Sequence, residues 1–160
     1  MLFGKKEERL LAPVTGECVP LSSVPDEAFS SGMLGKGFGV TPTLGEIYAP
    51  IDGKVESIAV GKHAYTILSD SGLDVLIHIG VDTVTLGGEG FSPQVMEGQR
   101  VRAGDLLARV ALDVIRQKEL SDAVTVIVTN SERIQSIEYT YGACVAGKDV
   151  AMKLRLERKG

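Results

Sequence analysis

The chain has 160 residues, 44% of them hydrophobic and 24% charged, with a formal net charge of −4 at pH 7. This composition is typical of one globular domain with a sizeable core, and the absence of a basic stripe makes nucleic acid a poor partner. No apolar run approaches the ~20 residues that cross a membrane, and the N-terminus lacks the apolar core of a signal peptide. We therefore expect a cytoplasmic protein without stable membrane insertion.

The N-terminal residues 1–10 are rich in charge and are expected to form a flexible tail, with residues 11–160 as a single domain. An alternative is that Leu2 and Phe3, followed by Lys5 and Lys6, touch a membrane surface weakly.

A weak internal repeat follows the tail. Residues 12–16 read Ala-Pro-Val-Thr-Gly, and residues 49–53 read Ala-Pro-Ile-Asp-Gly. Pro-x-x-Gly units of this kind mark tight turns between short strands. A third glycine-spaced stretch, residues 95–107, resembles the sandwiches of biotinyl and lipoyl domains. Repeated short strands with glycine turns predict an all-β sandwich or barrel.

Residues 24–35 lie between the two copies of the repeat and predict a short helix. Pro25 and the two acids after it suit a first helical turn, and one turn would place Phe29 and Met33 on one face. This face could cap the core or serve as an exposed docking surface, and the residues alone leave both alternatives open.

The two histidines of the chain, His63 and His78, are flanked by β-forming residues and separated by the turn signal at 70–72. A two- or four-residue loop would place them opposite each other in a hairpin, with Cβ atoms ~5 Å apart. A three-residue loop with a bulge at Gly72 would instead move the partner of His63 to Ile79.

The C-terminal half predicts further strands at 124–129, 134–141 and 150–156, and one short helix at 113–120 that Asp113 could cap. The glycine-rich stretch 83–91 is expected to be a loop. It lacks the Lys-Ser/Thr ending of a phosphate loop, so we expect no nucleotide there.

The paired histidines suit phosphoryl transfer better than two other chemistries. A zinc site needs three or four ligands, and Asp82 would lie ~13 Å from His78 along a straight strand. Acid–base catalysis needs an orienting carboxylate, and Asp74 is also four residues away. Phosphoryl transfer needs only a neutral imidazole nucleophile and a second group that stabilises the transferred charge.

The two cysteines, Cys18 and Cys144, have no metal-type spacing. We expect two reduced structural thiols, with a disulfide between them as the less favoured alternative. The sequence predicts neither a metal site nor a cofactor.

From about Leu11 to Leu156 the chain resembles the glucose-family enzyme IIA proteins of the bacterial phosphoenolpyruvate-dependent sugar phosphotransferase system. The motifs that carry the resemblance are the repeat at 49–53, His63-Ala64, the run Val-Leu-Ile-His-Ile-Gly-Val-Asp-Thr-Val at 75–84, and Glu-Gly-Phe at 89–91.

The resemblance implies a single EIIA type-1 domain. Its fold would be an antiparallel β-sandwich of the duplicated hybrid type, with one or two short helices. It implies a phosphotransferase component in which His78 accepts a phosphoryl group on Nε2 from the phosphocarrier HPr. His78 would then pass this group to a cysteine of the IIB domain of a sugar permease, and His63 would support the transfer. The apolar docking face and its edge would comprise Asp26, Phe29, Met33, Leu34, Leu76, Asp82 and Val84.

The sequence departs from its relatives at two positions. Relatives often carry a hydroxyl residue two places before the supporting histidine, where this chain has Gly61, so backbone or water would have to orient His63. A large apolar docking residue of the relatives is replaced by Ala59.

Three alternatives share parts of this pattern. Lys153 lies in an Ala-Met-Lys-Leu run similar to the biotin acceptor, but it is too near the end of the chain to occupy a hairpin tip in mid-domain. A lysostaphin-type zinc peptidase needs a His-x-His pair, which His78 does not provide. A regulatory module, whose phosphorylation state controls its partners, is compatible with the same residues.

Overall fold

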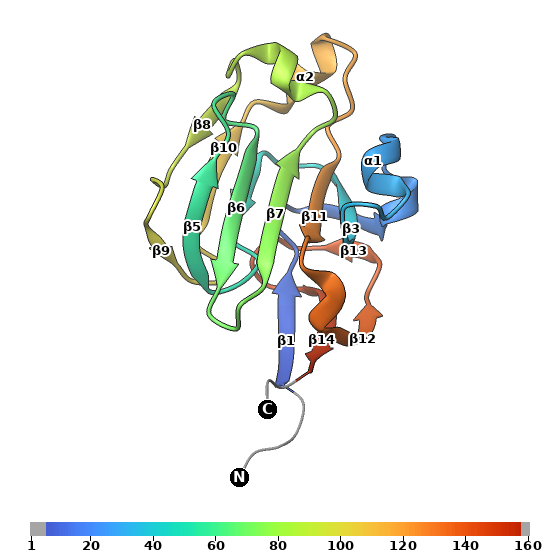
Figure 1. Cartoon of the computed structure of the whole chain (residues 1–160). Helices are drawn as coiled ribbons and strands as arrows, with labels where there is room; N and C mark the ends of the chain where they lie inside the picture. The colour runs from blue at the N-terminus through green and yellow to red at the C-terminus, as the bar shows by residue number, and fades with distance from the viewer. Residues whose placement is uncertain (1–5, 158–160) are drawn as a thin grey trace.

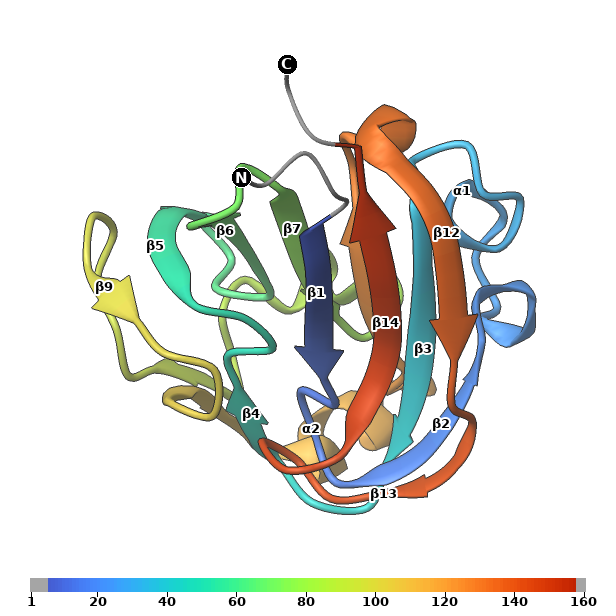
Figure 2. The same ribbon diagram turned by 90° about the horizontal axis from the view of Figure 1, so that it is seen from below.

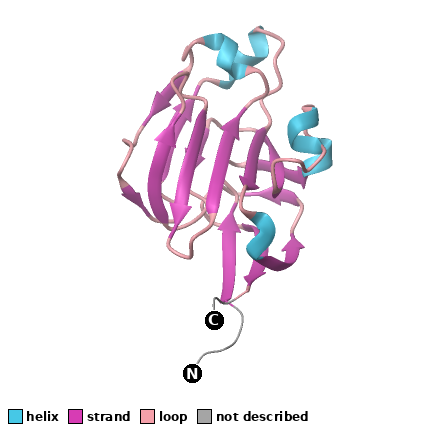
Figure 3. Cartoon of the chain, in the orientation of Figure 1, coloured by secondary structure: helices cyan, strands magenta, loops and turns pink. Residues whose placement is uncertain are grey.

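Antiparallel strands are the main regular structure of the molecule (Figure 3), and the computed structural model describes residues 6–157. An eight-stranded sheet has the order β13-β2-β3-β11-β7-β6-β5-β9, and two three-stranded sheets have the orders β1-β14-β12 and β4-β10-β8. This architecture confirms the predicted antiparallel β-sandwich (Figures 1 and 2).

The strands of the eight-stranded sheet are β13 (Gly142–Cys144), β2 (Gly16–Pro20), β3 (Lys36–Pro42), β11 (Val124–Val128), β7 (Asp74–Ile79), β6 (Ala64–Ser69), β5 (Gly53–Ile58) and β9 (Arg100–Val101). The two smaller sheets contain β1 (Lys6–Leu11), β14 (Val150–Leu156) and β12 (Ile134–Tyr139), and β4 (Glu46–Tyr48), β10 (Leu106–Val110) and β8 (Phe91–Pro93). The three strands predicted at 124–129, 134–141 and 150–156 therefore correspond to β11, β12 and β14.

The predicted duplication is visible in the hydrogen bonds of the two repeat copies. The Ala12 amide donates to the carbonyl of Asp149 at 2.8 Å, and the Ala49 amide donates to the carbonyl of Asp105 at 2.8 Å. Each repeat copy thus meets the loop before a later strand, and each leads directly into a strand of the large sheet, β2 or β5. The two repeat copies therefore have the same local plan.

Short helices cover parts of the sandwich. They are α1 (Glu27–Ser30), α2 (Leu112–Gln117) and the 3-10 turns η1 (Leu21–Ser23), η2 (Thr83–Leu86) and η3 (Ser131–Arg133). Within residues 6–157, no helix has the length and apolar character needed to span a bilayer.

Two details of the predicted helices are wrong. The helix α1 ends at Ser30, so Phe29 and Met33 do not share a helical face: Phe29 is 6% exposed and Met33 is 75% exposed. Asp113 does not cap α2, because the helix begins one residue earlier and its N-cap position is Ala111. Asp113 lies in the first turn, where a negative charge is favourable beside the free amides.

The predicted N-terminal tail is also wrong for residues 6–10, which belong to β1 and pair with β14. Leu10 of this strand is completely buried in the core, whereas Glu7 and Arg9 form an exposed ion pair of 3.0 Å. Residues 1–5, and the membrane contact considered for Leu2 and Phe3, lie outside the described residues. At the other end, Lys153 lies inside β14 and not at a hairpin tip, which gives no support to the biotin-carrier alternative.

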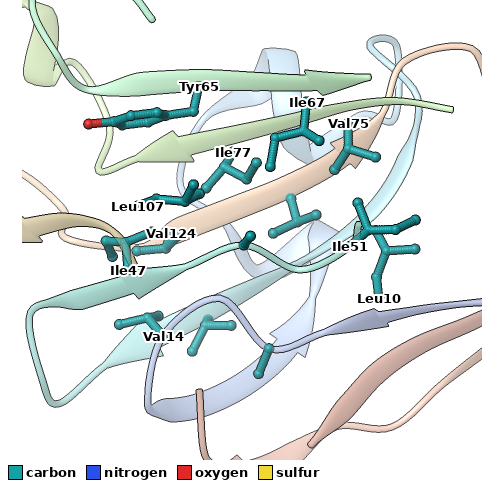
Figure 4. Packing of buried hydrophobic residues seen from close by; sticks show 14 of the residues in the cluster. Leu10, Val14, Ile47, Ile51, Tyr65, Ile67, Val75, Ile77, Leu107 and Val124 are labelled. Atoms are coloured by element: carbon teal, nitrogen blue, oxygen red, sulfur yellow. The ribbon is translucent and has the colours of Figure 1, made fainter. Parts of the chain in front are cut away.

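The main core fills the space between the sheets (Figure 4). Tyr65 and Ile67 of β6, Ile77 of β7, Leu107 of β10 and Leu10 of β1 belong to this core, and all five side chains are fully buried. Because side chains alternate along a strand, the neighbours of Ile77 on β7 point to the opposite, outer face of the large sheet.

A second, smaller cluster covers this outer face next to β7. It consists of Val24, Phe29, Val81, Ala123 and Ile127. The segment containing η1 and α1 therefore packs over β11, beside the outer face of β7, and forms a wall along one side of His78.

Both cysteines are buried free thiols on the neighbouring strands β2 and β13. Burial, together with the smaller effect of the neighbouring Cys144, raises the pKa of the Cys18 thiol to about 12. A thiol with so high a pKa is not a nucleophile at neutral pH, which agrees with a packing role.

Candidate functional site

The hairpin β6–β7 carries both histidines, but its register differs from the even-loop prediction. Ala64, not His63, is paired with His78. His63 lies opposite Ile79, whose amide donates to the His63 carbonyl at 2.8 Å. This is the register expected for the alternative of a three-residue loop.

The loop owes its length to Gly72, which adopts φ 91°. The Gly72 amide donates to the Ser69 carbonyl at 3.0 Å, and the Ser69 amide donates to the Leu73 carbonyl at 2.8 Å. A turn closed in this way and followed by a left-handed glycine is the three-residue hairpin with a bulge. The bulge shifts the register by one residue, because two residues of one strand oppose one of the other.

The two imidazoles nevertheless meet on the outer face. Their ring centroids are 5.2 Å apart and the rings are inclined at 73°, edge to face. His63 precedes the first residue of β6 and follows Lys62, which adopts the left-handed conformation at φ 63°. Because His63 lies outside the regular strand, the alternation of side chains does not hold it on the inner face. The predicted proximity of the two imidazole rings is confirmed, although the hairpin register that produces it differs from the even-loop prediction.

His78 is anchored through one ring nitrogen. Its Nδ1 lies 2.7 Å from the carbonyl oxygen of Gly80. A carbonyl can only accept, so Nδ1 carries the proton and the neutral ring presents its lone pair at Nε2. The ring of Phe29 lies against the imidazole with centroids 5.0 Å apart and a 57° tilt. Backbone and aromatic contacts thus fix both the tautomer and the orientation of His78.

The surroundings keep His78 neutral. Burial lowers its pKa below the ordinary 6.5, and the nearby His63 lowers it further. The Gly80 carbonyl and the charges of Asp26 and Asp82 act in the opposite direction, but burial is the largest effect. A neutral imidazole with a free Nε2 lone pair is the nucleophilic form of the side chain.

Asp82 is closer to His78 than a straight strand would place it. β7 ends at Ile79, and the chain then turns through left-handed conformations at Gly80, φ 77°, and Asp82, φ 60°. Asp82 is exposed on the rim, near enough for its charge to raise the pKa of His78. The distance of ~13 Å expected from a continuous strand is therefore not the real geometry, because the strand does not continue.

His63 is held by packing and backbone rather than by a hydroxyl. The residue is 8% exposed, and its buried Nδ1 has no hydrogen-bond partner among residues 6–157. A Cβ atom at Gly61 would lie 2.7 Å from this Nδ1 and 3.1 Å from Cε1. The ring therefore occupies the space that a side chain at position 61 would need, which identifies a contact that orients His63.

The predicted docking residues differ in their exposure to solvent. Met33, Leu34 and Val84 are exposed apolar side chains. Leu76 is half-buried on the outer face of β7, two residues from His78. Phe29 is the exception: it is buried, so it forms a wall of the site and offers little surface to a partner.

Asp26 has a clear local role at the edge of this face. Its Oδ1 accepts a hydrogen bond of 2.9 Å from the Ala28 amide and so caps α1. The same carboxylate is close enough to favour positive charge on His78. One residue thus connects the position of α1 with the electrostatics of the histidine.

Three groups at or near the two histidines were not predicted from the sequence. The first is the Gly80 carbonyl, which no sequence pattern marks because any residue has a carbonyl. The second is Val60, fully exposed in the turn between β5 and β6, next to the partly exposed Ala59. Its signal was an apolar residue in a glycine-containing turn. The third is Thr125 of β11, which lies opposite His78 in the sheet.

The arrangement contains few groups for other chemistries. Within residues 6–157, no group of three or more His, Cys, Asp or Glu side chains is placed to hold a metal ion. The geometry therefore offers a neutral imidazole nucleophile, a second imidazole beside it and an apolar rim.

Comparisons with known proteins agree with this geometry. The family model described as phosphoenolpyruvate-dependent sugar phosphotransferase system, EIIA 1, matches residues 8–134. The structure is similar to the solved glucose permease IIA from Mycoplasma capricolum, with a TM-score of 0.88 and 36% sequence identity. The alignment covers 96% of this chain and 99% of that one.

Proposed function

The chain belongs to the EIIA 1 family of the phosphoenolpyruvate-dependent sugar phosphotransferase system, and on that premise we propose that it is a phosphohistidine carrier. His78 accepts a phosphoryl group from phosphorylated HPr and passes it to the cysteine of the IIB domain of a sugar permease. Sugar is taken up and phosphorylated as a result. We propose that this exchange takes place in the cytoplasm.

The observation that carries this proposal is the hydrogen bond from His78 Nδ1 to the Gly80 carbonyl. It leaves Nε2 as the nucleophile. The Nε2 lone pair forms a bond to phosphorus, and the bond between phosphorus and its carrier side chain on HPr breaks with its electron pair staying on HPr. In the second step the IIB cysteine thiolate bonds to phosphorus, and the electron pair of the Nε2–phosphorus bond returns to His78.

The groups around His78 stabilise the positive charge that the imidazole ring gains on phosphorylation. Once Nε2 is bonded to phosphorus while Nδ1 keeps its proton, the ring becomes cationic. The Gly80 carbonyl accepts from Nδ1, and the carboxylates of Asp26 and Asp82 favour positive charge on the ring. These are preorganised dipoles and charges directed at the site where charge appears.

His63 supports the phosphoryl group itself. Because no protein acceptor faces its buried Nδ1 among the described residues, we assign the proton of the neutral ring to Nε2. With the rings 5.2 Å apart, this N–H can donate to a phosphoryl oxygen on His78. The two histidines therefore have different roles: His78 carries the group and His63 stabilises it.

A second candidate function is regulatory binding, and the exposed apolar rim favours it. Met33, Val60 and Val84 are exposed apolar side chains, and a phosphorylated His78 would carry roughly two additional negative charges. Such a change alters the affinity of an apolar surface for its partners. Carrier and regulator can be the same protein.

The carrier function is tested by incubating the protein with phosphoenolpyruvate, enzyme I and HPr and measuring acid-labile phosphate. The wild type should become labelled, and His78→Ala should take up no label. His63→Ala should accept the group from HPr but transfer it to a IIB domain much more slowly.

The exposed Val145→Asp variant, on the edge strand side of the sheet, serves as the matched control and should behave as wild type. Absence of label on the wild type would exclude the carrier function. Loss of acceptance in His63→Ala would contradict the division of roles between the histidines.

A further inference from the structure

Thr125 lies directly beside the phosphoryl acceptor on the flank away from His63. It is paired with His78 in the register of β11 and β7, and directly opposed residues have Cβ atoms about 4.5–5.5 Å apart on the same face. The sheet order β11-β7-β6 places His78 between Thr125 on one side and His63 on the other. The structure thus brings a hydroxyl to the carrier histidine.

This hydroxyl is buried and has no partner. Thr125 is 0% exposed, and its Oγ1 makes no hydrogen bond to residues 6–157. Buried hydroxyls are nearly always satisfied, because leaving one unpaired destabilises the folded protein. An exception next to a reactive side chain calls for a functional reason.

The surroundings of Thr125 would suit an apolar residue better. Ala123, just before β11, and Ile127 within it are each two residues from Thr125 and pack in the small cluster with Val24 and Phe29. A valine has nearly the same shape as threonine and would continue this apolar row without an unpaired hydroxyl. Packing alone therefore does not explain why the residue is threonine.

We propose that the Thr125 hydroxyl donates a hydrogen bond to a phosphoryl oxygen when His78 is phosphorylated. This rests on the proposed carrier function and adds a phosphoryl-binding residue to it. The phosphoryl group brings three strong acceptor oxygens to a place where Thr125 lacks an acceptor. His63 donates from the β6 side and Thr125 from the β11 side, so the group is held between two donors.

The chemical step is unchanged by this bond. The phosphorus still leaves its carrier side chain on HPr and bonds to His78 Nε2, with the electron pair of the broken bond staying on HPr. The Thr125 proton stays on its oxygen throughout. The hydroxyl stabilises the phosphorylated state, because hydrogen bonds to charged acceptors are stronger than those to neutral ones.

The test is the equilibrium between phosphorylated HPr and this protein, measured for wild type and for Thr125→Val, Thr125→Ser and Thr129→Val. Thr125→Val should lower the equilibrium constant for phosphorylation of His78 about tenfold, the size expected for one charge-assisted hydrogen bond. It should also raise the melting temperature, because an unpaired buried hydroxyl is removed.

Thr125→Ser keeps the hydroxyl, so the hydrogen bond to the phosphoryl oxygen can still form. Its equilibrium constant should therefore stay within about twofold of wild type. Thr129→Val is the matched control. It lies just beyond β11, four residues or ~13 Å along the chain from Thr125, and should leave the equilibrium unchanged.

An unchanged equilibrium constant in a folded, phosphorylated Thr125→Val protein would overturn the inference while leaving the carrier function intact. A wild-type protein that takes up no phosphoryl group would instead refute the carrier function on which the inference rests. A melting temperature that rises without a change in phosphorylation would show that Thr125 has no part in binding the group.

Discussion

Replacing Gly61 by alanine should displace His63 and slow phosphoryl transfer. A Cβ atom at this position would lie 2.7 Å from Nδ1 of His63, whereas ordinary contacts begin at 3.4 Å. Gly61 does not adopt a left-handed conformation, so alanine is compatible with its backbone. The added methyl group therefore acts through its contact with the ring, which must retreat by about 0.7 Å if the loop backbone stays in place.

The expected loss follows from this displacement. Because a misplacement of about 1 Å in a catalytic group can cost roughly 100-fold in rate, Gly61→Ala should transfer the phosphoryl group to IIB about 10- to 100-fold more slowly. Acceptance from HPr should be much less affected, as we expect for His63→Ala. Rapid-quench measurement of both half-reactions separates the two rates.

A double-mutant cycle identifies the route of the effect. If Gly61 acts only by making room for the ring, Gly61→Ala should have no further effect in a protein that already carries His63→Ala. Equal losses in the two backgrounds would show that the alanine disturbs the loop itself. A wild-type transfer rate in the single variant, with unchanged imidazole resonances of His63, would refute the packing account of its orientation.

Three further predictions concern protonation, docking and the thiols. Burial lowers the pKa of His78, so its NMR titration midpoint should lie below 6.5. The folded protein gains stability from the neutral ring above pH 6.5, and this stability should be lost as the pH falls through the midpoint. A midpoint above 6.5 would contradict this. Val84→Asp should weaken HPr binding about tenfold, because it places a charge in an apolar contact. Val145→Asp is the control and should not weaken binding: Val145 is 48% exposed and Val84 is 60% exposed, but Val145 follows β13, four strands from β7. Equal weakening by the two variants would exclude Val84 from the interface. Cys18 should resist thiol reagents at pH 8 until the protein unfolds, because its pKa is raised to about 12, and rapid native labelling would show that it is not buried.

The features of the site that could be predicted from the sequence are those encoded in local patterns. The β-forming flanks and the turn at residues 70–72 gave the hairpin, and the two histidines within it gave a candidate nucleophile and its neighbour. The family motif at 75–84 then assigned unequal roles to them. The register could not be predicted, because loops of two, three and four residues all fit the turn sequence, and only the left-handed Gly72 in the folded chain selects the bulge.

Other features depend on contacts between distant segments. β1 was missed because its charged side chains hide the alternation of a strand; its pairing with β14 and the burial of Leu10 provide what its sequence pattern does not. The Gly80 carbonyl and the Thr125 hydroxyl acquire meaning only when the turn after β7 and the register of β11 bring them to His78.

The most direct test of the carrier mechanism is NMR of the phosphorylated protein labelled with 15N at histidine. Coupling between 31P and the ring nitrogens identifies which nitrogen of which histidine carries the group. The hydrogen bond of 2.7 Å from Nδ1 to the Gly80 carbonyl predicts that the bond forms at Nε2 of His78, with Nδ1 still protonated. Phosphorus on Nδ1 of His78, or on His63, would contradict the mechanism.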